Sequence, residues 1–176
     1  MSEWVTGLSI LAVALASGWY DVRERRIPNF LTVFAFALAI SISALGGLGS
    51  LGVSLLGAGL SLLLALPLFL LRGLGGGDVK LLVAFGAFLG PTRLFPAFIV
   101  MAFVGGALGL VAMIRQGAVR RTFVNLYLMG QTVRDRIFAR GKDAQSMFWV
   151  TLDTPGAVTV PYGVAISAGA LYAWFF

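Results

Sequence analysis

Two aspartates stand out in this sequence because each lies between an apolar stretch and a short polar or glycine-rich one. Asp21 closes the charge-free run Trp4–Tyr20, and Asp78 stands between Gly75–Gly77 and another apolar run. Two carboxylates that are brought together cannot both ionise easily, so the pair shares a proton. One can then take a proton from an attacking water, while the other polarises a peptide carbonyl and later protonates the leaving amine.

The lack of histidine and cysteine excludes several kinds of catalytic site. The chain of 176 residues has no His and no Cys, which excludes disulfide frameworks, Cys/His zinc sites, thiol nucleophiles and Ser-His-Asp arrangements. A pair of aspartates needs neither a metal nor a cofactor, and we expect neither.

The elements that carry these aspartates are predicted to be membrane helices. The chain is 59% hydrophobic and 11% charged, with a mean hydropathy of +0.95, whereas a soluble domain has about 45–50% apolar and about 25% charged residues. An all-α polytopic membrane protein with about six spans is therefore expected. The predicted spans are Trp4–Tyr20, Phe30–Leu45, Leu51–Leu71, Val79–Leu89, Leu94–Ile114 and Ala157–Phe176.

Glycine and proline separate several of these spans. A tight turn is expected at Gly46–Ser50, and Gly90-Pro91 ends the fourth span. The stretch Gly73–Asp78 is too rich in glycine to be expected as helix. Gly105 and Gly109 form a GxxxG pair, which favours helix packing. We expect residues 1–176 to form a single membrane-embedded domain.

The basic residues predict the orientation. Arg23, Arg25 and Arg26 follow the first span, Arg72 and Lys80 flank the glycine-rich stretch, and seven more lie in the polar segment Arg115–Pro155, which leaves Arg93 alone on the other side. By the positive-inside rule, the basic segments are cytoplasmic and both termini are not. The polar segment is either a solvated linker or contains an interfacial helix. Nothing in the pattern indicates nucleic-acid binding.

Three motifs carry a resemblance to a known family. Asp21–Asn29 resembles the D-x-x-x-x-[RK]-[IL]-P-[ND] segment of type IV prepilin peptidases. Gly75–Leu82 fits their second motif, GxGD followed by x-K-L, and Val160–Ala165 resembles the P-[YF]-G stretch that opens their last helix. The motifs stand in the family's order across essentially the whole chain, and its compact form is similar to the TadV/CpaA-like members.

The resemblance implies an intramembrane aspartic endopeptidase that removes the basic leader of type IV (Flp-type) prepilins or pseudopilins. Asp21 and Asp78 match the catalytic pair, which would face the cytoplasm in the bacterial inner membrane. Supporting residues that match the motifs are Gly75, Gly77, Lys80, Arg26, Pro28, Asn29, Pro161, Tyr162 and Gly163. Of these, Arg26 and Lys80 are expected to pair with lipid phosphate or orient the acids. Asn29 is expected to cap the second helix and Pro28 to start it.

The expected partners are a prepilin substrate, the lipid bilayer and the pilus assembly machinery. Glu24 and Asp153 are acids that could counter the charge of a basic leader. Larger members of the family carry paired cysteines in an N-terminal region and N-methylate the cleaved pilin. Because this sequence has no Cys, we expect cleavage without methylation and no S-adenosylmethionine site.

Two alternatives remain open at this point. The presenilin and signal-peptide-peptidase branch also carries GxGD, but it pairs that motif with a YD inside an earlier helix and a later PAL motif, where this chain has Pro161-Tyr162-Gly163. A small transporter or a non-enzymatic assembly subunit could use the aspartates for ion coupling or structure. No inverted repeat supports transport, and Asp→Asn substitutions separate an enzyme from a scaffold.

Overall fold

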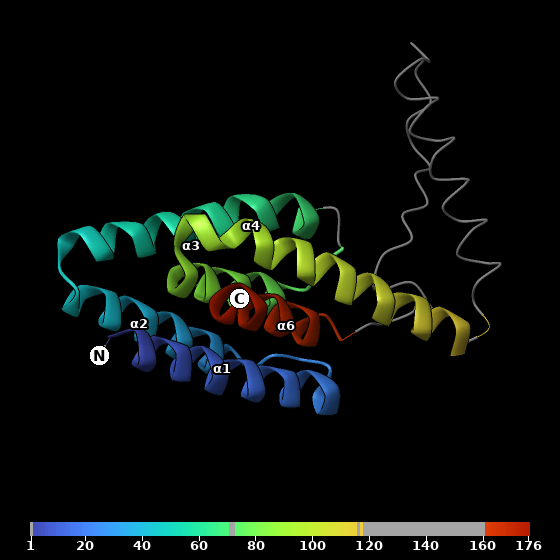
Figure 1. Cartoon of the computed structure of the whole chain (residues 1–176). Coiled ribbons are helices and arrows are strands. Elements are labelled where there is room, and N and C mark those ends of the chain that lie inside the picture. Colours follow the sequence, from blue (N-terminus) through green and yellow to red (C-terminus); the bar gives the residue numbers. More distant parts are fainter. Residues whose placement is uncertain (1, 71–72, 116, 118–160) are drawn as a thin grey trace, which may run out of the picture. The chain divides into compact units, whose positions relative to one another are not determined.

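The chain is all-helical wherever the structure, a computed structural model, describes it, which is over residues 2–70, 73–115, 117 and 161–176. Its helices are α1 (Ser2–Glu24), α2 (Asn29–Leu45), α3 (Leu48–Leu70), α4 (Gly76–Arg115) and α6 (Tyr162–Phe175) (Figure 1). The polar segment beyond Arg115, with Asp153, and the predicted start of the last span at Ala157 lie outside the described residues, apart from Gly117.

The fold divides into two compact units, Met1–Ala107 with Pro161–Phe176, and Leu108–Val160. All of the packing reported below belongs to the first unit. Of the second unit, the described residues are the last turns of α4 and Gly117, which has a positive φ of 60°. The expectation of a single domain stays a prediction.

The described helices confirm the predicted class, an all-α polytopic membrane protein. Three of them, α1, α3 and α4, are long and apolar enough to cross a membrane, and α2 and α6 are shorter apolar helices. Large apolar side chains such as Phe34, Leu63 and Phe103 are exposed on their outer surfaces, as expected of surfaces that face lipid. The number of spans and the side on which the termini lie stay predictions.

Three predicted helix boundaries are wrong: the end of α1 and the starts of α3 and α4. Helix α3 begins at Leu48 and not at Leu51. Helix α1 continues past Asp21 to Glu24, and the amide of Arg25 donates to the Asp21 carbonyl oxygen at 3.0 Å before a φ of 52° at Arg25 ends the helix. Helix α4 begins at Gly76, so part of the glycine-rich stretch is helical after all. There the Asp78 side chain accepts a hydrogen bond from the Gly75 amide. This bond stabilises the first turn of α4, which its glycines by themselves would disfavour.

The predicted fourth and fifth spans form one long element with a break inside it. Gly90 has φ 66° and ψ 175° within α4, a conformation that is open essentially to glycine. Pro91 follows directly, so the break lies where the sequence predicts the fourth span to end. The turn between α2 and α3 likewise falls at Gly46 and Gly47, within the predicted segment.

Small residues allow α3 and α4 to approach closely. A Cβ on Gly57 would meet the Gly86 carbonyl oxygen and would lie 2.7 Å from the Gly90 Cα. The Ser54 hydroxyl donates to the Ala87 carbonyl oxygen at 2.8 Å, a contact that needs backbones this close. Gly105 of the predicted GxxxG pair is buried in α4 and lies against Ala165 of α6.

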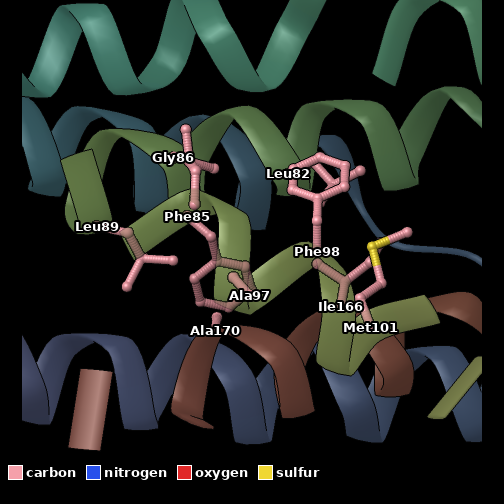
Figure 2. Close-up of a pocket in the computed structure, with 10 residues that line it drawn as sticks. Leu82, Phe85, Gly86, Leu89, Ala97, Phe98, Met101, Ile166 and Ala170 are labelled. Carbon is pink, nitrogen blue, oxygen red and sulfur yellow. The ribbon is translucent and has the colours of Figure 1, made fainter. Parts of the chain in front are cut away.

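A small apolar cavity lies between the two halves of α4 and α6. Phe85, Phe98 and Met101 of α4 line it together with Ile166 and Ala170 of α6, as Figure 2 shows. Every lining residue is apolar or glycine, and such a cavity offers no partner to a polar ligand or to water. The candidate chemistry therefore has to be sought elsewhere, at the ends of the helices.

Candidate active site

The Asp21 side chain extends from α1 and is buried against the first turn of α6. It is 5% exposed, and its Oδ2 accepts hydrogen bonds from the amides of Gly163 at 2.6 Å and Val164 at 3.3 Å. These amides belong to the first turn of α6, whose N-cap residue, Pro161, provides no side-chain hydrogen bond. A helix start leaves its first amides without partners. Asp21 therefore supplies from α1 the cap that α6 lacks.

Glycine at position 163 makes this contact possible. A Cβ built on Gly163 would lie 2.8 Å from the Asp21 Oδ2 and 3.0 Å from its Cβ and Cγ. Only a residue without a side chain brings the backbone this close to the carboxylate. This close contact explains why the third residue of the P-[YF]-G motif is glycine. The second residue of the motif, Tyr162, packs against Gly105.

Asp78 is held in a related way by its own helix. It lies in the first turn of α4, it is partly buried, and its Oδ2 accepts the Gly75 amide at 3.2 Å. An acid three residues after the helix cap that bonds back to the cap amide forms half of a capping box. Both candidate carboxylates are thus oriented by backbone amides at helix starts.

Contacts between α2 and α4 bring Asp78 to the end of α1. A Cβ on Gly77 would lie 3.3 Å from the Ile27 carbonyl oxygen, in the turn that follows α1. The Lys80 Nζ donates to the Asn29 Oδ1 at 2.8 Å and joins the first turns of α4 and α2. These contacts place the first turn of α4, which carries Asp78, beside the turn that follows α1, the helix that carries Asp21. Within the described residues no group of three or more potential metal ligands forms.

The supporting residues have different surroundings. The expected roles of Pro28 and Asn29 are wrong: Pro28 is the N-cap residue of α2, Asn29 is its first helical residue, and neither side chain caps the helix. The Asn29 amide oxygen accepts a hydrogen bond from Lys80. Arg26 is exposed and forms no hydrogen bond or ion pair with either aspartate. Within the described structure, therefore, neither Arg26 nor Lys80 orients the acids directly.

Three residues near Asp21 were not predicted as part of the site. The Val164 amide is a second donor to its carboxylate, and a pair of buried serines, Ser17 and Ser167, lies one helical turn away. Their spacing was the available signal, since Ser17 precedes Asp21 by four residues and Ser167 follows Gly163 by four. Residues four apart share a face of a helix.

Comparison with known proteins finds one family and two curated relatives. The family model described as "Type IV leader peptidase family" matches residues 8–110, which include both aspartates. Two curated relatives from Burkholderia pseudomallei, strains 1026b and K96243, are each named "Prepilin leader peptidase/N-methyltransferase". Each is 35% identical over 115 residues, and the aligned region covers 61% of this chain and 37% of the relative. The chain therefore matches little more than a third of the relatives' length. No solved structure matches it.

Proposed function

This chain belongs to the type IV leader peptidase family, and we propose that it is an intramembrane aspartic endopeptidase in which Asp21 and Asp78 activate water. The observation that carries the proposal is the convergence of the two carboxylates. They come from different helices whose ends are brought together by the contact between Gly77 and Ile27, and each is oriented by backbone amides. Membership of the family supports a prepilin-processing peptidase of the inner membrane. The aspartate mechanism goes beyond that membership.

The chemistry requires one carboxylate and one carboxylic acid. The carboxylate accepts a proton from water as its oxygen attacks the scissile carbonyl carbon, and the acid hydrogen-bonds the carbonyl oxygen as that oxygen gains charge. Collapse of the tetrahedral intermediate breaks the C–N bond as the carboxylic acid gives its proton to the leaving amine, and the proton taken from water stays on the other aspartate, so the pair again holds one proton. Water is divided between the two products, so the step needs no other reactant. Because coupled carboxylates titrate as a pair, acid and base are not assigned to individual residues.

The hydrogen bonds at Asp21 fit such a role. Both bonds from α6 go to Oδ2, and within the described residues Oδ1 receives none. One oxygen is thus held by the protein while the other can meet water. Orientation by backbone amides keeps the carboxylate in place at little reorganisation cost during the reaction.

We further assign the substrate and the orientation. The substrate is a Flp-type prepilin or pseudopilin with a basic leader, cut at the cytoplasmic face, because the basic residues near Asp21 and Asp78 mark that side of the membrane. Cleavage occurs without methylation, a proposal supported by the absence of the paired cysteines that the larger members of the family carry. Mass spectrometry of the new N-terminus after cleavage with added S-adenosylmethionine tests this point, and a methylated product would contradict it.

The main test is cleavage in cells. The chain is co-expressed with a Flp-type prepilin in a host that lacks its own prepilin peptidase, and the precursor is followed by size. We expect the wild type to shorten it, whereas Asp21→Asn and Asp78→Asn leave it intact, because an amide can neither accept nor supply the proton. Glu3→Gln makes the same change at an exposed acid in the first turn of α1, and it should cleave like the wild type.

The outcomes separate the possible readings. Loss of cleavage in both aspartate variants at normal membrane levels supports the two-aspartate mechanism. Cleavage by both Asn variants would refute that mechanism while leaving a peptidase. No cleavage by the wild type, with any of a panel of Flp-type prepilins, would refute the assigned substrate.

A further inference from the structure

A pair of buried hydroxyls joins α1 and α6 one turn away from Asp21. The Oγ atoms of Ser17 and Ser167 lie 2.9 Å apart, and the two residues are 0% and 5% exposed. Ser17 precedes Asp21 by one turn of α1, and Ser167 follows Gly163 by one turn of α6. The contacts Ser17–Ser167 and Asp21–Gly163 therefore join the same two helices and lie one helical turn apart.

The pair is also linked directly to the residue that holds Asp21. The Ser167 hydroxyl donates to the Gly163 carbonyl oxygen at 2.7 Å, and the Gly163 amide donates to the Asp21 Oδ2. The Ser17 hydroxyl has a single proton, which it can donate either to Ser167 or to the Val13 carbonyl oxygen, 2.7 Å away in its own helix. When it donates to Ser167, hydrogen bonds connect Ser17 of α1 through Ser167 to Gly163, whose amide holds the Asp21 carboxylate.

The other contacts between these helices do not define a register so narrowly. Apart from Asp21 and the two serines, the described buried residues of α1 and α6 are apolar or glycine, among them Ile10, Ala14 and Ala170. Apolar packing tolerates small shifts along the helix axis, whereas the contact between the two hydroxyls forms at one register only. Away from that register each hydroxyl keeps the carbonyl acceptor of its own helix, and the hydrogen bond between the helices is lost.

We propose that Ser17 and Ser167 are positioning residues that set the α1–α6 register at which Gly163 holds the catalytic carboxylate of Asp21. They touch neither substrate nor the reacting atoms, and they act through the Gly163–Asp21 hydrogen bond. This inference rests on the proposed function, since it presupposes that Asp21 is catalytic.

The test compares serine variants of the purified enzyme in nanodiscs. Ser17→Ala, Ser167→Ala and the double variant are measured for kcat and KM with a prepilin substrate, at a temperature well below their unfolding transitions. Each single change is expected to lower kcat by about threefold to tenfold, the range that corresponds to one net buried hydrogen bond. KM is expected to stay unchanged. Ser167→Cys, with a weaker donor in a similar volume, should fall between wild type and Ser167→Ala.

The double variant distinguishes positioning from general loosening. Because both hydroxyls serve one contact, the double variant should lose no more kcat than the more damaging single variant. Ser54→Ala is the matched control, since Ser54 is equally buried and donates an interhelical hydrogen bond to Ala87. It should lower the unfolding temperature by a similar amount and leave kcat unchanged.

Wild-type kcat in both serine variants would overturn the proposal, as would multiplying effects in the double variant or an equal loss of kcat in Ser54→Ala. Asp21→Asn, measured in the same assay, separates this failure from failure of the proposed function. If Asp21→Asn is inactive while the serine variants match Ser54→Ala, only the positioning role is lost. If Asp21→Asn still cleaves, the proposed mechanism itself is refuted.

Discussion

Replacement of Gly163 by alanine tests whether the hold on Asp21 matters for cleavage. The new Cβ would lie 2.8 Å from the Asp21 Oδ2, whereas ordinary van der Waals contacts begin at 3.4 Å. The carboxylate or α6 therefore has to move by roughly half an ångström. A displacement of about 1 Å in an active site can lower the rate on the order of a hundredfold. Loss of a hydrogen bond to a charged group is worth about 1.5–3 kcal/mol, which converts to about tenfold to a hundredfold. We expect kcat to fall by that factor.

The expected loss is steric and not one of helix propensity. Alanine is favoured over glycine in a helix by about 1 kcal/mol, so α6 by itself should tolerate the change. The assay is cleavage of a prepilin by purified enzyme, with membrane levels and thermal unfolding measured in parallel. Gly18→Ala is the control, because Gly18 lies on α1 near Asp21 and its Cβ would meet nothing within 4 Å. Wild-type kcat in Gly163→Ala would refute the reasoning.

Two further changes probe the surrounding framework. Gly57→Ala should lower the free energy of unfolding in detergent by about 1–3 kcal/mol, because the new methyl group would overpack against the backbone of Gly86. Gly59→Ala on the same helix is the control, since its Cβ would meet nothing within 4 Å and stability should not change. Equal melting temperatures of the two variants would contradict the close approach of α3 and α4. Lys80→Met and Asn29→Ala should each lower kcat/KM by about twofold to fivefold, because they remove the same hydrogen bond between α4 and α2. The double variant should lose no more than either single change, and additive losses would show that the two residues act separately.

Much of the helix pattern was predictable from local signals. Long charge-free runs located the helices, and glycine with proline located the break at Gly90, because these signals act over a few residues. The end of α1 and the start of α4 were not predictable in the same way. At both places the outcome depends on hydrogen bonds formed in the folded chain, such as the one between Asp78 and Gly75.

The site shows the same division. Asp21, Asp78 and Gly163 were predicted from motifs, and their roles in catalysis stay proposals. The motifs gave no indication that the Gly163 amide donates to Asp21, or that Ser17 and Ser167 form a second contact between α1 and α6 one turn away. Those contacts join residues far apart in the chain, and helical periodicity within one segment carries no information about its partner.

The sequence by itself determined the class of the protein, the places where most of its helices form, and the acids available for chemistry. Composition and hydropathy suffice for that, because a polypeptide without enough polar surface has to bury its backbone hydrogen bonds in helices within lipid. Only the tertiary structure decided which helix start caps which carboxylate. That choice depends on α1 and α6 packing closely enough for a backbone amide to reach Asp21 Oδ2, an approach that the missing side chain of Gly163 permits.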